Sequence, residues 1–196
     1  MSVRDEASGR ERASRRAETV LAHIGTSSDP GTGALTTPIY LSTAYAHPGL
    51  GASTGYDYTR TANPTRDVLQ SALAQIEGGT AGFATSSGMA AAELVVSLAA
   101  PGSRIVAAED IYGGTFRYFD ELARTGVYDV DFAMGEQGLC DALAKPADLV
   151  FIETPTNPMM VEIDIERIVD LGHRAGAVVA VDNTFYTPIF QRPLES

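Results

Sequence analysis

The chain has 196 residues, of which 44% are apolar and 20% charged, as in ordinary globular domains. Its formal net charge of -11 argues against nucleic acid as a partner, because phosphate backbones attract basic surfaces. A single cysteine, Cys140, excludes an internal disulfide and a multi-cysteine zinc site. No run of eighteen apolar residues predicts a membrane span, and residues 1–16 lack the apolar core of a secretory signal. We therefore expect a soluble cytoplasmic protein with no membrane partner.

The first third of the chain shows no sustained helix or strand period. Residues 1–17 are polar and rich in Arg and Glu, which is typical of a disordered tail. Residues 18–64 are rich in Thr, Ser, Gly, Pro and Tyr, and such a long irregular segment is unusual inside a compact domain. We expect residues 18–64 to form an extended arm that lies on a partner subunit.

The remainder, residues 65–196, alternates between short apolar strands and amphipathic helices. Segments such as 149–152 and 178–181 are continuously apolar, as in strands buried on both faces. The repeated strand–helix–strand order predicts an α/β fold with a mainly parallel sheet and helices on both faces. The expected helices are 65–77, 88–99, 115–124, 139–144 and 165–175, and the expected strands are 82–85, 104–108, 127–132, 149–152 and 177–181.

Three polar clusters follow expected strands, where ligands bind in sheets of this type. In the first, residues 85–89, small side chains would let an anion approach a helix N-terminus, although a serine there is most often only an N-cap. The second, residues 153–158, is a proline-stiffened loop presenting Glu153, Thr156 and Asn157, and taken alone it is better explained as an ordinary turn. In the third, residues 182–184, a carboxylate either caps a helix or faces a cationic ligand.

Metal and nucleotide sites find little support in the sequence. The three histidines, His23, His47 and His173, show no ligand spacing with one another or with Cys140, so no metal site is predicted. No G-x-G-x-x-G follows any expected strand, which argues against a dinucleotide-binding domain.

Five motifs, taken in order, resemble the pyridoxal-phosphate-dependent enzymes of Cys/Met metabolism, of the cystathionine γ-synthase/γ-lyase type. The resemblance covers residues 18–196 and implies pyridoxal 5'-phosphate as cofactor. It also implies that residues 65–196 are an incomplete large domain of the fold type I (aspartate aminotransferase-like) transferases. The motifs are Tyr58-Thr59-Arg60 with Asn63-Pro64-Thr65, Ser86-Ser87-Gly88-Met89, Tyr112-Gly113-Gly114-Thr115, Glu153-Thr154-Pro155-Thr156-Asn157-Pro158, and Val181-Asp182-Asn183-Thr184-Phe185.

The resemblance implies roles around the cofactor. Gly88 and Met89 would offer backbone amides to its phosphate, and Ser87 would shape that turn. Tyr112 would stack on the pyridine ring and receive a proton. Asp182 would pair with the protonated pyridine nitrogen and keep the ring electron-poor.

The remaining roles concern the edges of the site and the partner subunit. Thr184 would support the ring, and Asn157 would contact the cofactor's phenolic oxygen. Tyr58 and Arg60 would reach from the arm into the neighbouring subunit's phosphate site, where a bidentate guanidinium suits a phosphate. A homo-oligomer, a dimer of dimers, follows from the resemblance.

The resemblance also implies transsulfuration. An O-acylated homoserine or cystathionine would lose a proton at Cα and then at Cβ, which permits γ-elimination or γ-replacement. Methionine γ-lyases carry a cysteine where Gly114 stands, so the glycine favours the cystathionine γ-synthase or γ-lyase type. O-acetylhomoserine sulfhydrylase and methionine γ-lyase are alternatives among enzymes, and a non-catalytic module that associates with a full-length relative is the alternative outside them.

One feature departs from the family pattern. The lysine that bonds to the cofactor belongs to a Ser-x-Thr-Lys segment shortly after the next strand, and the sequence stops before it, at Ser196. The only lysine, Lys145, lies elsewhere in the topology and is predicted to be a solvated loop residue. We interpret the sequence as a fragment of a longer enzyme whose sheet has an unfinished edge, with a shortened product lacking turnover as the alternative.

Overall fold

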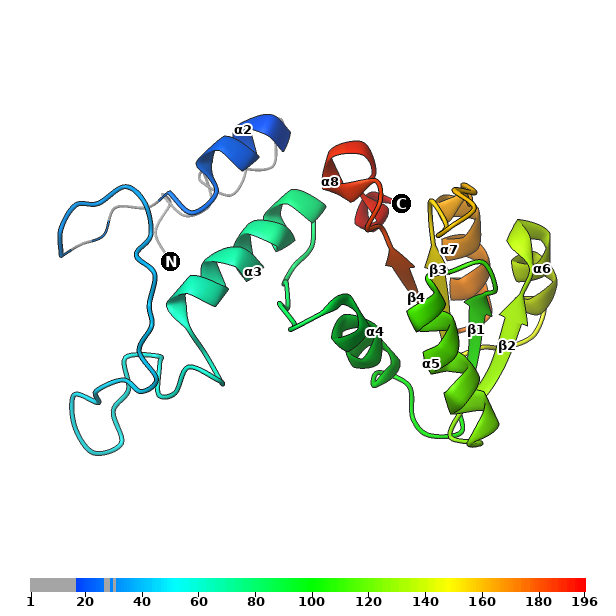
Figure 1. The fold of residues 1–196 in the computed structure, drawn as a ribbon, viewed down its shortest axis with the longest axis horizontal. Coiled ribbons are helices and arrows are strands. Elements are labelled where there is room, and N and C mark those ends of the chain that lie inside the picture. Colours follow the sequence, from blue (N-terminus) through cyan, green and yellow to red (C-terminus); the bar gives the residue numbers. More distant parts are fainter. Residues whose placement is uncertain (1–16, 27–28, 30) are drawn as a thin grey trace. The chain divides into compact units, whose positions relative to one another are not determined.

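The computed structural model describes residues 17–26, 29 and 31–196 (Figure 1). The chain divides after Ala84 into two compact units, each considered by itself below. The predicted domain boundary after Pro64 therefore lies within the first unit. The predicted disordered tail lies outside the described residues except for Ala17. Within the described residues, no helix combines the length and apolar character needed to cross a membrane.

The first unit contains two helices, α2 (Ala17–His23) and α3 (Pro64–Glu77). The prediction that residues 18–64 contain no helix is wrong for α2. This short helix packs against α3 and buries Val20, whose exposure is only 8%. Between the helices the described residues are irregular, with isolated bridges pairing Thr26 with Thr36 and Ala44 with Tyr58.

The limits of α3 follow from residues at its two ends. The Asn63 side chain accepts hydrogen bonds from the backbone amides of Thr65 and Arg66, and Pro64 occupies the first turn, where no amide is needed. At the other end Gly78 adopts a left-handed conformation with φ of 75°, which ends the helix. The helix predicted over residues 65–77 is thus confirmed.

The strand predicted at residues 82–85 is absent. This segment lies against α3 instead of beside another strand. The Ala84 amide donates to the Gln70 side chain at 3.0 Å, and a Cβ at Gly82 would lie 2.4 Å from the Gln70 carbonyl oxygen. The segment is extended, but its hydrogen bond goes to a helix side chain and so it forms no ladder.

The second unit is built on a four-stranded parallel sheet in the order β2-β1-β3-β4, which confirms the predicted α/β architecture. The strands are β1 (Arg104–Ala108), β2 (Asp129–Ala133), β3 (Leu149–Glu153) and β4 (Val178–Asp182). The helices are α4 (Gly88–Val96), α5 (Gly113–Arg124), α6 (Gly135–Ala142), α7 (Ile165–Arg174), the short α8 (Thr187–Phe190) and a 3-10 turn, Pro193–Glu195.

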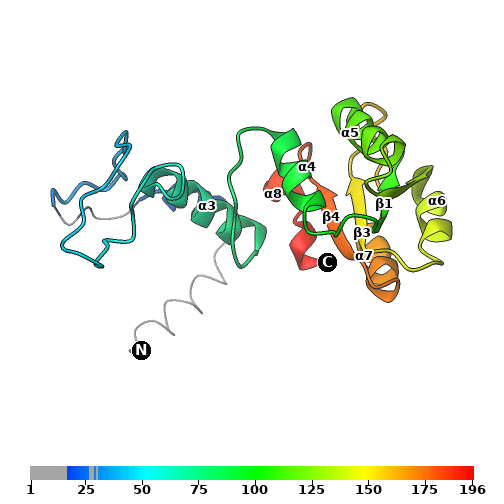
Figure 2. The same ribbon diagram turned by 90° about the horizontal axis from the view of Figure 1, so that it is seen from below.

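Helices cover both faces of this sheet, as predicted, and Figure 2 shows α5 and α7 on opposite sides of β3. Successive residues of a strand point to opposite faces. The Phe151 ring meets the ring of Phe119 from α5 edge-on, with centroids 5.3 Å apart. Its neighbour Val150 packs on the other face, beside Gly172 of α7. Every residue of β3 is buried, which fixes the strand that carries the candidate site.

Two further predictions need correction. The helix expected over residues 139–144 begins earlier, at Gly135, and ends at Ala142; within it, Gly138 lies close to the backbone of Ala133. Residues 178–181 are not buried on both faces: β4 is an outer strand of the described sheet, and Val178 is 51% exposed.

Candidate active site

Strands β3 and β4 each have an acidic residue at their carboxyl end. Glu153 ends β3, Asp182 ends β4, and the two are paired in register. Because directly paired residues of parallel strands project to the same face, both carboxylates lie on one side of the sheet. This is the face covered by α5, since Glu153 follows Phe151 by two residues.

Glu153 joins these strands to the start of α5. Its Oε2 accepts a hydrogen bond from the backbone N–H of Tyr112 at 2.9 Å, and its side chain is buried, with the residue 4% exposed. Burial raises the pKa of Glu153 above its ordinary value, and the nearby carboxylates of Asp182 and Asp110 add to the rise. Hydrogen bonding from the amides of Tyr112 and Asn157 opposes it. The Glu153 carboxyl group therefore accepts hydrogen bonds from the backbone amides of two predicted cofactor-binding residues, Tyr112 and Asn157.

The loop after β3 is fastened by buried hydroxyl groups. The Thr156 hydroxyl donates to Asp110 Oδ2 at 2.6 Å and accepts from the Val161 amide at 3.0 Å. The Thr154 hydroxyl accepts from the Ile163 amide at 3.0 Å. Of the three polar side chains that this loop was expected to present, Glu153 and Thr156 are buried, and Asn157 alone is partly exposed.

The Asp182 carboxylate accepts hydrogen bonds from Thr184, two residues later in the same turn. Its Oδ1 accepts from the Thr184 amide at 3.0 Å and from the Thr184 hydroxyl at 2.5 Å. These bonds fix one carboxylate oxygen of Asp182. Thr184 thus orients the carboxylate that was predicted to face the cofactor ring nitrogen.

The N-terminus of α4 has the features expected of an anion site. The Ser87 side chain caps the helix by accepting from the Ala90 amide at 3.1 Å. The amides of Gly88 and Met89, in the first turn, have no acceptor within the helix. A Cβ at Gly88 would meet no atom within 4 Å, so the turn is open to a ligand. The dipole of α4 favours a negative charge at this point.

Tyr112 stands between this turn and the two acids. It is the N-cap residue of α5 and is 48% exposed. Its ring crosses the space above Gly114, where a Cβ would come within 2.4 Å of Tyr112 Cε1 and 3.1 Å of Met89 Sδ. These contacts place the start of α4 beside the start of α5. The second unit therefore brings together Ser87, Gly88, Met89, Tyr112, Asn157, Asp182 and Thr184, all of them predicted site residues.

The two predicted site residues of the arm lie in the first unit. Arg60 stacks its guanidinium over the Tyr58 ring, with Cζ 4.9 Å from the centroid. Both stay predicted ligands of a partner's cofactor phosphate.

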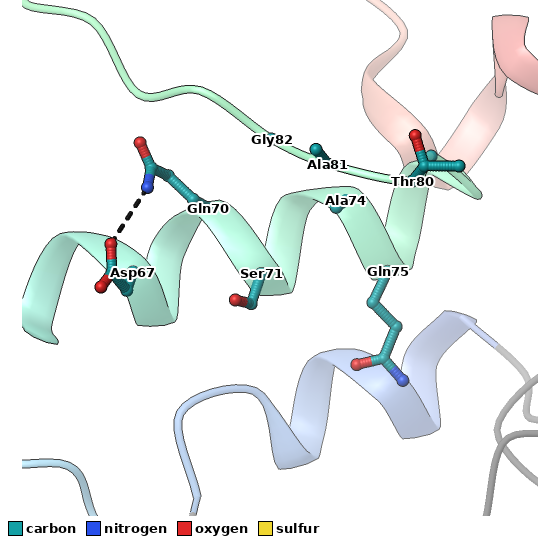
Figure 3. A pocket seen from close by; sticks show the side chains of 9 residues that line it. Asp67, Gln70, Ser71, Ala74, Gln75, Thr80, Ala81 and Gly82 are labelled. Atoms are coloured by element: carbon teal, nitrogen blue, oxygen red, sulfur yellow. Dashed lines mark hydrogen bonds between the residues drawn. The ribbon is translucent and has the colours of Figure 1, made fainter. Parts of the chain in front are cut away.

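A pocket of about 430 Å³ in the first unit lies between α3 and residues 79–82, with Gln70 and Asp67 hydrogen-bonded on its wall (Figure 3). None of the predicted site residues lines it. Across the described parts of both units, no group of three or more His, Cys, Asp and Glu side chains is arranged to hold a metal ion.

Sequence reasoning missed two residues of this site. Asp110, the partner of Thr156, lies just beyond the carboxyl end of β1. An acidic pair at a strand end, Glu109-Asp110, was the available signal. Gly114 was noted only as a residue that distinguishes members of the family. Its position against the Tyr112 ring, where a side chain would not fit, is visible only in the structure.

Residues 18–196 match the family described as "Cys/Met metabolism PLP-dependent enzyme". The chain belongs to this family. Pyridoxal phosphate is the family's cofactor, so the predicted family and cofactor are confirmed.

Similar proteins cover nearly all of the chain. The cystathionine gamma-synthase/O-acetylhomoserine (thiol)-lyase of Bacillus subtilis is 47% identical, over 93% of this chain and 49% of that protein. The cystathionine gamma-lyase of the same organism is 42% identical, over 90% of this chain and 47% of its own length. The crystal structure of cystathionine gamma synthase from Xanthomonas oryzae pv. oryzae, in complex with aminoacrylate and cysteine, superposes with a TM-score of 0.89 at 41% identity, over 92% of this chain and 48% of that one. The chain spans about half the length of the relatives it matches.

Proposed function

We propose that the chain forms part of the cofactor site of a transsulfuration enzyme of the cystathionine γ-synthase or γ-lyase type. Such an enzyme acts on sulfur amino acids or O-acylhomoserine by γ-elimination or γ-replacement. The observation that carries the proposal is the link from Tyr112 through Glu153 to Asp182: the backbone N–H of Tyr112 donates to Glu153, which is paired in register with Asp182 at the carboxyl ends of parallel strands. This is where ligands bind in open α/β sheets.

The residues of the second unit fit pyridoxal phosphate. Asp182 would pair with the pyridine nitrogen, Tyr112 would stack on the ring, and the amides of Gly88 and Met89 would bind the phosphate. The bound cofactor supplies an electron sink for charge developing at the substrate's Cα. Asp182 would favour that chemistry, because its negative charge would keep the ring nitrogen protonated.

The remaining predicted residues would act around this core. Ser87 would hold the phosphate-binding turn through its cap, Asn157 would reach the cofactor's phenolic oxygen, and Thr184 would keep Asp182 oriented. The Tyr112 hydroxyl would carry a proton released by the substrate. The Ser87 cap and the hydrogen bonds from Thr184 to Asp182 support these roles.

Lys145 does not fit the role of covalent partner to the cofactor. It precedes β3 and its carbonyl accepts from the Arg104 side chain at the amino end of β1. That is the end of the sheet opposite to Glu153 and Asp182. We propose that another part of the complete enzyme supplies the amine.

We also propose that the arm docks on a second copy of the chain. Apolar side chains of the irregular segment are strongly exposed, with Ile39 at 77% and Leu41 at 90%. Such side chains gain free energy when a partner covers them. Tyr58 and Arg60 would then reach the partner's phosphate turn.

Binding of pyridoxamine 5'-phosphate tests the proposed site, because this form has no aldehyde to react with Lys145. Replacing Asp182 by Asn removes the charge at similar size and should weaken binding about tenfold, the worth of a charged hydrogen bond. Asp170→Asn is the matched control, since Asp170 is an exposed residue of α7 paired with Arg174. Equal affinities of the two variants, or no binding by the unaltered chain, would overturn the proposal.

A further inference from the structure

We propose that Glu153 and Gly114 are positioning residues for Tyr112: Glu153 holds its backbone and Gly114 leaves the space that its ring occupies. The proposal rests on the proposed function only in that Tyr112 is taken as the ring that stacks on the cofactor. The placement of the ring itself stands on contacts within the second unit.

Glu153 fixes the backbone from which the ring projects. Its Oε2 accepts from the Tyr112 amide at 2.9 Å, and the amide of Asn157 acts on the same carboxyl group. This carboxyl group is buried on the last residue of a fully buried strand, so it has little freedom to move. A carboxylate at the N-terminus of α5 also interacts favourably with the helix dipole, which offsets part of the cost of its burial.

Tyr112 has few other constraints. Its own side chain makes no capping hydrogen bond to α5, and among the described residues its hydroxyl has no hydrogen-bond partner. The ring is about half exposed. Its position is therefore determined by the direction of the backbone and by the room available beside it.

Gly114 provides that room. A Cβ at this position would lie 2.4 Å from Tyr112 Cε1, a distance that two non-bonded carbon atoms do not tolerate without movement, and a tight 3.1 Å from Tyr112 Cδ1. Met89 closes the other side, with Sδ 3.1 Å from the same point. Any side chain at position 114 therefore displaces the Tyr112 ring, and it also crowds the side-chain sulfur of Met89.

The neighbouring glycine offers a matched control. A Cβ at Gly113 would meet only Arg117 Nη1, at 3.3 Å, which is the far end of a flexible side chain. Both glycines lie in the first turn of α5, so their replacement by alanine changes helix propensity in the same sense. Only the change at 114 intrudes on the ring.

Tyrosine NMR on the whole chain reports directly on the ring, after assignment of its signals with Tyr112→Phe. Gly114→Ala should shift the Tyr112 ring resonances and weaken pyridoxamine 5'-phosphate binding about tenfold, whereas Gly113→Ala should leave both near their original values. The chain contains no tryptophan, so tyrosine fluorescence can follow the same titrations. Equal responses of the two alanine variants would refute the role of Gly114.

Amide hydrogen exchange tests Glu153. Glu153→Gln keeps an acceptor for the Tyr112 amide, and Glu153→Leu removes it. Exchange at Tyr112 should be about tenfold faster in the leucine variant, and glutamine should restore most of the protection. Similar exchange in both variants would refute the positioning role. The ring and amide measurements need no ligand, so they decide this proposal even if the unaltered chain fails to bind pyridoxamine 5'-phosphate.

Discussion

Replacing Gly172 by alanine sets two opposing effects against each other at the junction of α7 and the sheet. On a free helix, alanine is more favourable than glycine by about 1 kcal/mol. At this buried position, however, the new Cβ would lie 2.6 Å from Val179 Cγ2 and 3.4 Å from Val150 Cγ2. The first distance is well inside contact range, and overpacking of this kind costs about 1–3 kcal/mol.

We expect the overpacking to exceed the helix gain. Val179 is β-branched and stiff at χ1, and it belongs to β4, where it is paired in register with Val150. The methyl group therefore has no easy route away from the new Cβ. The net result should be a loss of unfolding free energy of about 1 kcal/mol, together with a small displacement of β4.

A double-mutant cycle in urea isolates the contact. Val179→Ala removes the Cγ2 atom that the new methyl meets and costs about 1 kcal/mol by itself, because Val179 is only partly buried. In that background Gly172→Ala should become stabilising by about 1 kcal/mol, giving a coupling of about 2 kcal/mol. If Gly172→Ala costs the same with and without Val179, the close contact is not the cause and the reasoning is refuted.

Three further outcomes follow from single contacts. The pKa of Glu153 is raised above its ordinary 4.5, so the stability that this group contributes is present at low pH and is lost as the pH rises through the raised pKa. Glutamine does not titrate, so Glu153→Gln should gain stability relative to the unaltered chain as the pH rises. Urea unfolding from about pH 4 to about pH 8 measures this difference. Asn63→Ala should lower the local stability of α3 by about 1 kcal/mol and speed amide exchange at Thr65, while Asn63→Asp, which keeps the acceptor but loses the donor to the Tyr40 carbonyl, should leave exchange at Thr65 near its original rate. Phe119→Ala should cost about 3–5 kcal/mol in urea unfolding because it empties a fully buried place beside Phe151, and a loss below about 1 kcal/mol would contradict this packing.

The fold of the second unit was predictable because its signals are local. The continuously apolar run 149–152 predicted a strand buried on both faces, and β3 is buried at every residue. Where a prediction depended on neighbours, it was wrong. Residues 178–181 carry the same apolar pattern, but β4 has a strand on one side only within the described sheet, and Val178 is half exposed.

The failed strand at residues 82–85 has the same origin. Its composition suits a strand, but a strand exists only if another strand presents free backbone groups to it. In the first unit the available acceptor is the side chain of Gln70, and Gly82 is small enough to lie directly on the α3 backbone. Neither fact is visible in the composition of the segment.

The candidate site likewise contains residues that the sequence predicted and a contact that it could not predict. Asp182 and Tyr112 were both expected from motifs. Asp182 lies at the carboxyl end of β4 and Tyr112 at the start of α5, as their positions in the sequence predict. The bond from Glu153 to the Tyr112 amide joins residues 41 positions apart. Such a contact depends on how β3 and α5 pack, so no spacing within either motif could predict it.

The buried polar groups of the second unit tie the end of β3 and the loop after it to three neighbouring segments. Of its four buried polar residues, Glu153 ends β3, Thr154 and Thr156 belong to the loop that follows, and Thr115 belongs to α5. The first three bind different elements: the start of α5, the segment before α7, and the turn after β1. Burying polar groups is unfavourable unless each finds a partner, and each of these three side chains has one. Their presence stabilises one arrangement of the surrounding turns, and removing one of these buried hydroxyl groups should lower global stability because its hydrogen-bond partner is left unpaired.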